Sequence, residues 1–143
     1  MSPTTPAAAR PSVLFVCAHN AGRSQMAAAY LTHLSGGLID VSSAGAAPAD
    51  ALNPHAVAVM LQDAIDIREE SPKMLTVEAV QDADLVIALG AGDLRSFAPD
   101  RFYDEWDVPD PAGLSLEAVR RILDDIRERV IGLLDQLTVA AVA

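Results

Sequence analysis

The chain has 143 residues, 51% of them hydrophobic and 4% aromatic, and carries a formal net charge of −10. This length and composition predict one globular domain rather than a disordered chain. The acidic balance argues against nucleic acid or an anionic membrane as a partner, and no stretch approaches the roughly 20 apolar residues of a membrane span. We expect a loose tail over residues 1–11 and a single domain over residues 12–143.

The N-terminal half alternates apolar runs with helix-forming segments. Residues 12–16 form a short apolar run, which is typical of a strand buried on both faces of a parallel sheet. A polar loop with a glycine, residues 18–22, leads into a predicted helix over 23–34 that a Gly-Gly pair ends. A second strand is predicted over 38–42.

The C-terminal half continues the alternation. The predicted elements are a helix over 53–65 capped by Asn53, a short helix over 76–82, a strand over 84–89 and a final helix over 115–137 capped by Ser115. Residues 97–113 contain three prolines and are expected to be irregular. The final helix carries one apolar stripe. Strands alternating with helices predict an α/β fold with a parallel sheet covered on both faces.

The segment between the first strand and the first helix carries the predicted chemistry. Ligands of open parallel sheets bind at the carboxyl ends of strands, where loop N–H groups and a helix N-terminus converge into a cradle for an anion. The predicted cradle consists of Cys17, Ala18, His19, Asn20, Ala21, Gly22, Arg23 and Ser24. We therefore predict an oxyanion site at this loop.

Three residues of the loop have distinct predicted tasks. Cys17 comes first, where the loop dipoles and the Arg23 guanidinium favour its nucleophilic thiolate form. Arg23 can bind a tetrahedral oxyanion through two parallel hydrogen bonds, and Ser24 can donate a hydrogen bond to the sulfur. The alternative is that Cys17 is a buried structural thiol. The Cys-x5-Arg-Ser pattern directly after an apolar strand favours catalysis.

This loop resembles that of the low-molecular-weight protein tyrosine phosphatase superfamily, which includes the thiol-dependent arsenate reductases. Two details resemble the reductases: Gln25 follows Arg23-Ser24 where the phosphatases usually carry Pro, and Ala112 follows Asp110-Pro111 where they typically carry Tyr. The resemblance covers about residues 12–137. It implies a three-layer αβα fold with a central, mostly parallel four-stranded sheet.

The resemblance also implies roles for further residues. Asp110 would be the general acid that protonates the oxygen leaving arsenic as Cys17 attacks. Taken alone, Asp110 is equally a turn-forming residue before proline, and Asp104 and Asp107 are nearby alternatives.

Two further residues would support the loop. Asn20 would order it through side-chain hydrogen bonds, and Ser43 is similar to the family serine that bonds to this asparagine. A potassium site of some relatives uses an acid where Ala28 stands, and His33 and His55 lack the spacing of metal ligands. We therefore expect no metal.

The sequence departs from its thioredoxin-coupled relatives, which carry two further cysteines near the loop after the strand ending at Leu89. Here Cys17 is the single cysteine, so an internal disulfide relay is excluded, and a reducing cytoplasmic location is expected. No tightly bound cofactor is expected. The implied partners are arsenate, with phosphate or sulfate as mimics, an external thiol such as mycothiol or bacillithiol, and a glutaredoxin-like or mycoredoxin protein. The alternatives are an aryl or tyrosine phosphatase and a non-catalytic oxyanion-binding or thiol-sensing module.

Overall fold

A four-stranded parallel sheet organises the structure, a computed structural model that describes residues 10–92, 94 and 103–142. The strands are β1 (Ser12–Cys17), β2 (Asp40–Gly45), β3 (Leu85–Ala88) and β4 (Tyr103–Glu105), in the spatial order β2-β1-β3-β4. All three neighbouring pairs are parallel. The central strand β1 is nearly all apolar because both of its faces are covered.

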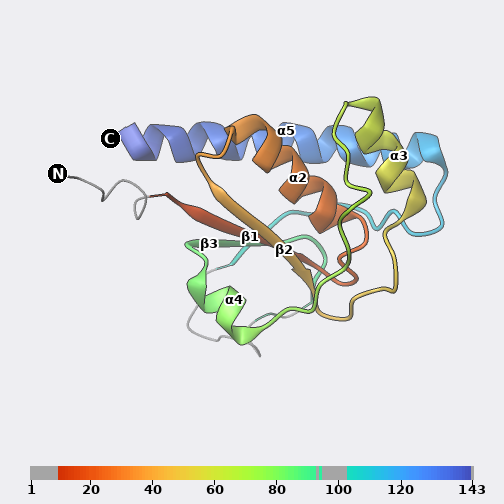
Figure 1. Cartoon of the computed structure of the whole chain (residues 1–143), viewed down its shortest axis with the longest axis horizontal. Coiled ribbons are helices and arrows are strands. Elements are labelled where there is room, and N and C mark those ends of the chain that lie inside the picture. Colours follow the sequence, from red (N-terminus) through yellow and green to blue (C-terminus); the bar gives the residue numbers. More distant parts are fainter. Residues whose placement is uncertain (1–9, 93, 95–102, 143) are drawn as a thin grey trace.

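Helices cover both faces of this sheet, as Figure 1 shows. The helices α2 (Arg23–Ser35), α3 (Pro54–Gln62) and α5 (Leu116–Val142) lie on one face, and the short α4 (Val77–Asp82) lies on the other. Alternate side chains of β1 enter the two cores: Phe15 packs with the three helices, and Val16 packs with Val80 of α4. The predicted three-layer α/β architecture is confirmed.

The apolar stripe of α5 anchors the larger core. Its middle positions are fully buried, whereas Leu116 at the start is 39% exposed. These buried positions are Val119, Leu123, Ile126 and Val130. Burying a side chain of this size contributes roughly 1.5–3 kcal/mol, so the stripe fixes α5 across α2 and α3.

Several predicted elements differ from the structure, beginning with the final helix, which runs to Val142 rather than 137. The second strand runs over Asp40–Gly45 rather than 38–42, because Leu38 is 66% exposed and Asp40 is the residue that pairs with Ser12. The helix α3 ends at Gln62 rather than 65, just before Ala64 takes a left-handed φ of 63°. The segment 97–113 is not wholly irregular, because it contains β4.

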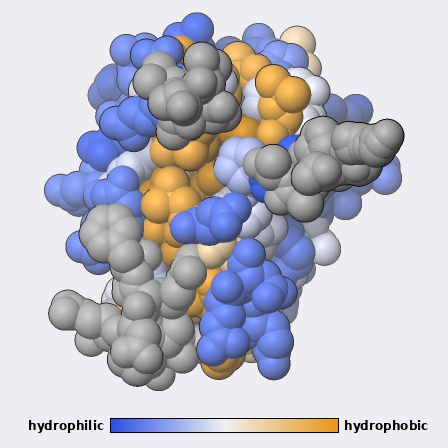
Figure 2. Space-filling model, turned by 90° about the vertical axis from the view of Figure 1, so that its left-hand side faces the viewer, coloured by the Kyte–Doolittle hydropathy of each residue, from blue (hydrophilic) through white to orange (hydrophobic). Residues whose placement is uncertain are grey.

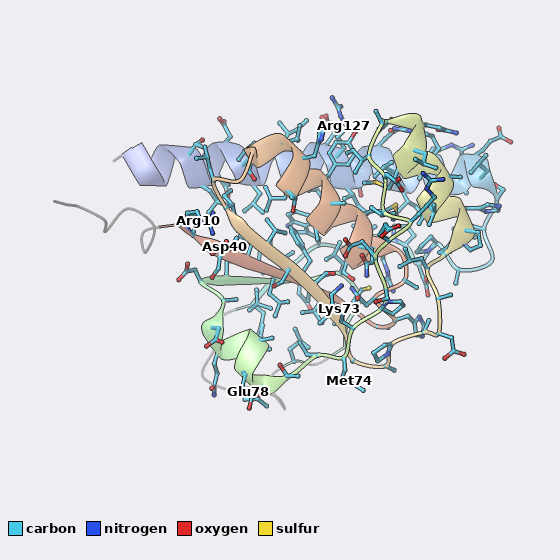
Figure 3. All side chains as sticks on the ribbon, in the orientation of Figure 1. Arg10, Asp40, Lys73, Met74, Glu78 and Arg127 are labelled. Atoms are coloured by element: carbon cyan, nitrogen blue, oxygen red, sulfur yellow. The ribbon has the colours of Figure 1, made fainter. Side chains whose placement is uncertain are left out.

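The predicted tail is only partly described, since residues 1–9 lie outside the described part. Arg10 and Pro11 belong to the fold: Arg10 Nη2 lies 2.6 Å from Asp40 Oδ1, and the Asp40 N–H donates to the Pro11 carbonyl at 2.8 Å (Figure 3). Figure 2 shows the end of the molecule that carries these residues, where hydrophobic side chains form a band between hydrophilic ones. Within the described residues, no helix has the length and apolar character needed to cross a membrane.

Candidate active site

The loop after β1 is held from outside by the segment that follows β2. Four carbonyl groups of residues 17–21 accept hydrogen bonds from this segment. The bonds run from the N–H groups of Ala46, Ala47, Ala49 and Asn53 to the carbonyl oxygens of Cys17, Ala18, His19 and Ala21, at 3.3, 2.8, 3.0 and 2.8 Å. Because a trans peptide carries its N–H opposite its C=O, the following N–H groups face the other way. The loop therefore presents donors away from its supporting segment.

Cys17 ends β1 with its side chain almost completely buried, at 1% exposed. Its sulfur lies 2.9 Å from Ser24 Oγ, and the N–H of Asn20 donates to it at 3.2 Å. Asn20 reaches this position by adopting a left-handed φ of 50°, an uncommon conformation for a residue other than glycine. One main-chain donor and one hydroxyl group thus meet at this sulfur.

Asn20 is fully buried, and its side chain organises the loop as the sequence predicted, although not through the predicted partner. Its Nδ2 donates to Ser24 Oγ at 2.7 Å. Its Oδ1 accepts from Gln25 Nε2 at 3.0 Å and from the main-chain N–H of Lys73 at 2.8 Å. Ser43 is buried on β2, but no hydrogen bond joins it to Asn20 among the described residues. The structure therefore brings the main-chain N–H of Lys73, and not Ser43, to Asn20.

Arg23 opens α2 and crosses to the segment that carries Asp110. Its guanidinium is buried, donates from Nη1 to the Val108 carbonyl at 3.2 Å, and lies 3.8 Å from Asp110 Oδ2. Gly90, which follows β3, packs directly against this guanidinium. Three segments far apart in the sequence therefore fix the direction of one cation.

Asp110 forms a local turn and also faces Arg23. Its Oδ1 accepts the Ala112 N–H at 3.0 Å, which is a local turn, while its Oδ2 faces Arg23. Its side chain is 47% exposed. Asp104, on β4, and Asp107 do not line the cavity that holds Cys17, so the structure brings Asp110 to the loop and not these two alternatives.

The loop and Asp110 enclose a cavity of about 320 Å³. Cys17, His19, Arg23 and Asp110 supply its reactive and charged groups, and apart from Asn53 the other walls are small or apolar. Further lining residues are Ala49, Ala51, Leu52, Pro54 and Pro111. No group of three or more His, Cys, Asp or Glu in the described ranges is placed to hold a metal ion. The cavity is suited to a small anion attacked by sulfur.

Fold and site together define a parallel α/β protein with a cysteine at the floor of an arginine-containing oxyanion loop. The family model described as low molecular weight phosphotyrosine protein phosphatase matches residues 12–142. The chain belongs to this family.

Three relatives place the chain within the family. It is 32% identical over 129 residues to the glutaredoxin arsenate reductase of Synechocystis, covering 88% of this chain and 98% of that one. A thioredoxin-dependent arsenate reductase of Corynebacterium glutamicum superposes with a TM-score of 0.79 at 32% identity, covering 91% of this chain but only 63% of that longer chain. The YwlE arginine phosphatase of Geobacillus stearothermophilus superposes with a TM-score of 0.84 at 26% identity, covering 92% and 96%.

Sequence reasoning missed the groups that orient the predicted residues. Gln25 carried a family signal, but its contact with Asn20 was not foreseen. The N–H of Lys73 and the carbonyl of Val108 are main-chain groups, so no residue type marks them. Gly90 adopts a φ of 76°, a conformation that glycine takes easily. The signal available in the sequence was the glycine itself, directly after a predicted strand.

Proposed function

We propose that this protein is an arsenate reductase that works with an external thiol. The convergence of the Cys17 sulfur, the Arg23 guanidinium and the Asp110 carboxyl on one small cavity carries the proposal. Sulfur is the nucleophile that arsenic chemistry needs, Arg23 offsets the charge of a tetrahedral oxyanion, and Asp110 supplies a proton. Phosphate and sulfate, which share the shape of arsenate, are expected to bind as mimics.

The first step is attack by the Cys17 thiolate on arsenic(V). A sulfur–arsenic bond forms while the bond between arsenic and a hydroxyl group of arsenate breaks, and the departing hydroxyl takes a proton from Asp110 and leaves as water. The loop N–H groups and Arg23 neutralise the three remaining oxygens. Arsenic stays in the +5 state, so nothing is reduced at this stage.

The second step requires a thiol from outside, because Cys17 is the single cysteine of the sequence. A low-molecular-weight thiol such as mycothiol or bacillithiol attacks arsenic and expels the Cys17 thiolate. A glutaredoxin-like or mycoredoxin thiol then attacks the sulfur of the released adduct. Arsenic leaves with the bonding electron pair as arsenite, and the two thiols become a mixed disulfide. Such thiols stay reduced in the cytoplasm, where we place the reaction.

The runner-up function is hydrolysis of a phosphorylated amino acid or aryl phosphate. The likeness to an arginine phosphatase over 92% of this chain favours it, since the same loop shape accepts phosphate. The absence of aromatic side chains among the cavity-lining residues of the described chain favours the reductase, because an aryl group gains from stacking walls. A non-catalytic oxyanion-binding module is the third possibility.

One experiment separates the three functions. The purified protein is incubated with arsenate, mycothiol or bacillithiol, and a glutaredoxin-like reductase, and arsenite is measured; aryl phosphate and phosphoarginine hydrolysis are assayed in parallel. We expect arsenite formation that disappears in Cys17→Ser. Phosphate release without arsenite would establish the phosphatase, and phosphate binding without either product would establish the binding module.

A further inference from the structure

Gln25, the second residue after the catalytic arginine, is buried at 2% exposed and points away from the cavity. Its Nε2 group contacts two oxygens, Asn20 Oδ1 at 3.0 Å and the Ser71 carbonyl at 3.1 Å. Because both partners are acceptors, the side chain must present its NH₂ group to them, and both of its hydrogens are used. Gln25 therefore ties the start of α2 to the oxyanion loop and to the segment containing Ser71.

A series of hydrogen bonds runs from the Lys73 N–H through the Asn20 amide and the Ser24 hydroxyl to the Cys17 sulfur. The Lys73 N–H is the starting point for assigning their directions. The Lys73 N–H can only donate, so the Asn20 atom facing it at 2.8 Å must be the carbonyl oxygen. The Asn20 Nδ2 group must then be the one that donates to Ser24 Oγ. A thiolate has no hydrogen to donate, so when Cys17 is ionised the bond of 2.9 Å between Ser24 Oγ and Cys17 Sγ requires the Ser24 hydroxyl as its donor.

We propose that Gln25 is a positioning residue that directs the Ser24 hydroxyl toward Cys17 by fixing the side-chain amide of Asn20. The proposal rests on the proposed role of Cys17 as the nucleophile. Gln25 supplies one of the two donors on Asn20 Oδ1, and its bond to Ser71 holds the segment that supplies the other. Without Gln25, the Lys73 N–H is the remaining donor on Asn20 Oδ1, and its segment loses the bond to Ser71 that ties it to α2. The Asn20 amide is then held less firmly, and in the fraction of molecules where it turns, the Ser24 hydroxyl can donate to Asn20 Oδ1 instead of the sulfur.

The test measures the rate of Cys17 alkylation by iodoacetamide as a function of pH. In Gln25→Met, which keeps the shape but donates no hydrogen bond, we expect the midpoint to rise by about one pH unit, a tenfold loss of thiolate at a fixed pH below it. Gln62→Met is the matched control, because Gln62 lies on α3 and its side chain bonds only to Arg120 among the described residues. An unchanged midpoint in folded Gln25→Met overturns the proposal.

Coupling to Ser24 separates positioning from general loosening of the loop. Ser24→Ala removes the hydroxyl through which Gln25 acts, so Gln25→Met should shift the midpoint by less than half as much in that background as in the native one. Equal shifts in both backgrounds would show that Gln25 acts by another route, and the proposal would fall.

Two further measurements cover a Gln25→Met protein that does not fold. Gln25→Glu places acceptor oxygens against the same two carbonyls, so it should raise the midpoint at least as much. In the unmodified protein, the Gln25 side-chain hydrogens should exchange with solvent at least tenfold more slowly than those of exposed Gln62, and equal rates would overturn the proposal. None of these measurements uses arsenate, so a failure of reductase activity would leave the result on Gln25 standing.

Discussion

A methyl group at Gly90 should displace the Arg23 guanidinium, whose atoms lie nearest to it. Gly90 has a left-handed φ of 76°, and a Cβ there would lie 2.2 Å from Arg23 Nη1 and 3.0 Å from Cζ. Ordinary contacts between non-bonded heavy atoms fall near 3.5–4.0 Å, so in Gly90→Ala the guanidinium must withdraw by roughly 1 Å or more. That movement breaks the alignment with Val108 and Asp110.

The magnitude follows from the sensitivity of catalysis to misplacement. A shift of about 1 Å in a positioning group costs about 10²-fold in rate, so kcat/KM for arsenate should fall by about that factor in Gly90→Ala. Gly92→Ala is the matched control, because Gly92 has a similar φ of 83° and no atom of the described residues lies within 4 Å of its Cβ position. Both variants lose roughly 1–2 kcal/mol from alanine in the left-handed region, and only one displaces Arg23.

The assay compares the two alanine variants by arsenite formation, by phosphate binding in titration calorimetry and by chemical unfolding. We expect similar losses of unfolding free energy, with weakened phosphate binding and slow turnover in Gly90→Ala alone. If Gly90→Ala turns over arsenate as fast as Gly92→Ala, the guanidinium tolerates the methyl group and its assigned position is not needed for catalysis.

Three other variants test separate parts of the structure. Gly22→Ala would place its Cβ 2.7 Å from Pro111 Cγ, so it should lower turnover about tenfold or more by moving the acid segment while Cys17 alkylation is retained. Asp110→Asn should slow turnover roughly 10²–10⁴-fold in steady-state assays and leave phosphate binding nearly unchanged; an equal loss of binding would refute its role as acid. Asp63→Asn should lower the unfolding free energy by about 2 kcal/mol at pH 7, because Asp63 binds the Arg120 guanidinium through both oxygens, at 2.9 and 3.0 Å. The Arg120 hydrogen bonds lower the pKa of Asp63 below 3.8, so the contribution of Asp63 to stability is fully present above pH 3.8. Unfolding free energies from urea titrations should show this contribution disappearing as the pH falls through the lowered pKa.

The sequence predicted best those parts of the fold where burial is complete. The strand β1 and the helix α5 carry apolar patterns because the strand beyond Ser12 and the middle of one helix face lie in the core. The oxyanion loop was predicted from its residue types, because thiol, guanidinium and hydroxyl side chains can be identified directly in the sequence. The chemistry predicted for this loop depends on those side chains.

The wrong or missing predictions lie at edges and on main-chain groups. The strand β4 has three residues at the edge of the sheet, two of them acidic and exposed, so it shows no apolar run. The strand β2 lies at the opposite edge and is partly polar for the same reason. Lys73 replaces Ser43 as a partner of Asn20 through its N–H, a group that every residue except proline possesses.

The two halves of the site differ in how firmly they are held, and the difference matches their tasks. The oxyanion loop is bound by the segments after β2 and before α4, and Cys17 and Asn20 are buried, so the donors are in place before an anion arrives. Preorganised donors of this kind stabilise charge without reorganising during the reaction. Asp110 instead remains 47% exposed, held by a local turn and a 3.8 Å approach to Arg23. An acid that gives up one proton in each turnover must regain it from water, and a buried carboxyl group could not do so as readily. A rigid, dry nucleophile beside a solvent-accessible acid is therefore the arrangement that the proposed chemistry requires.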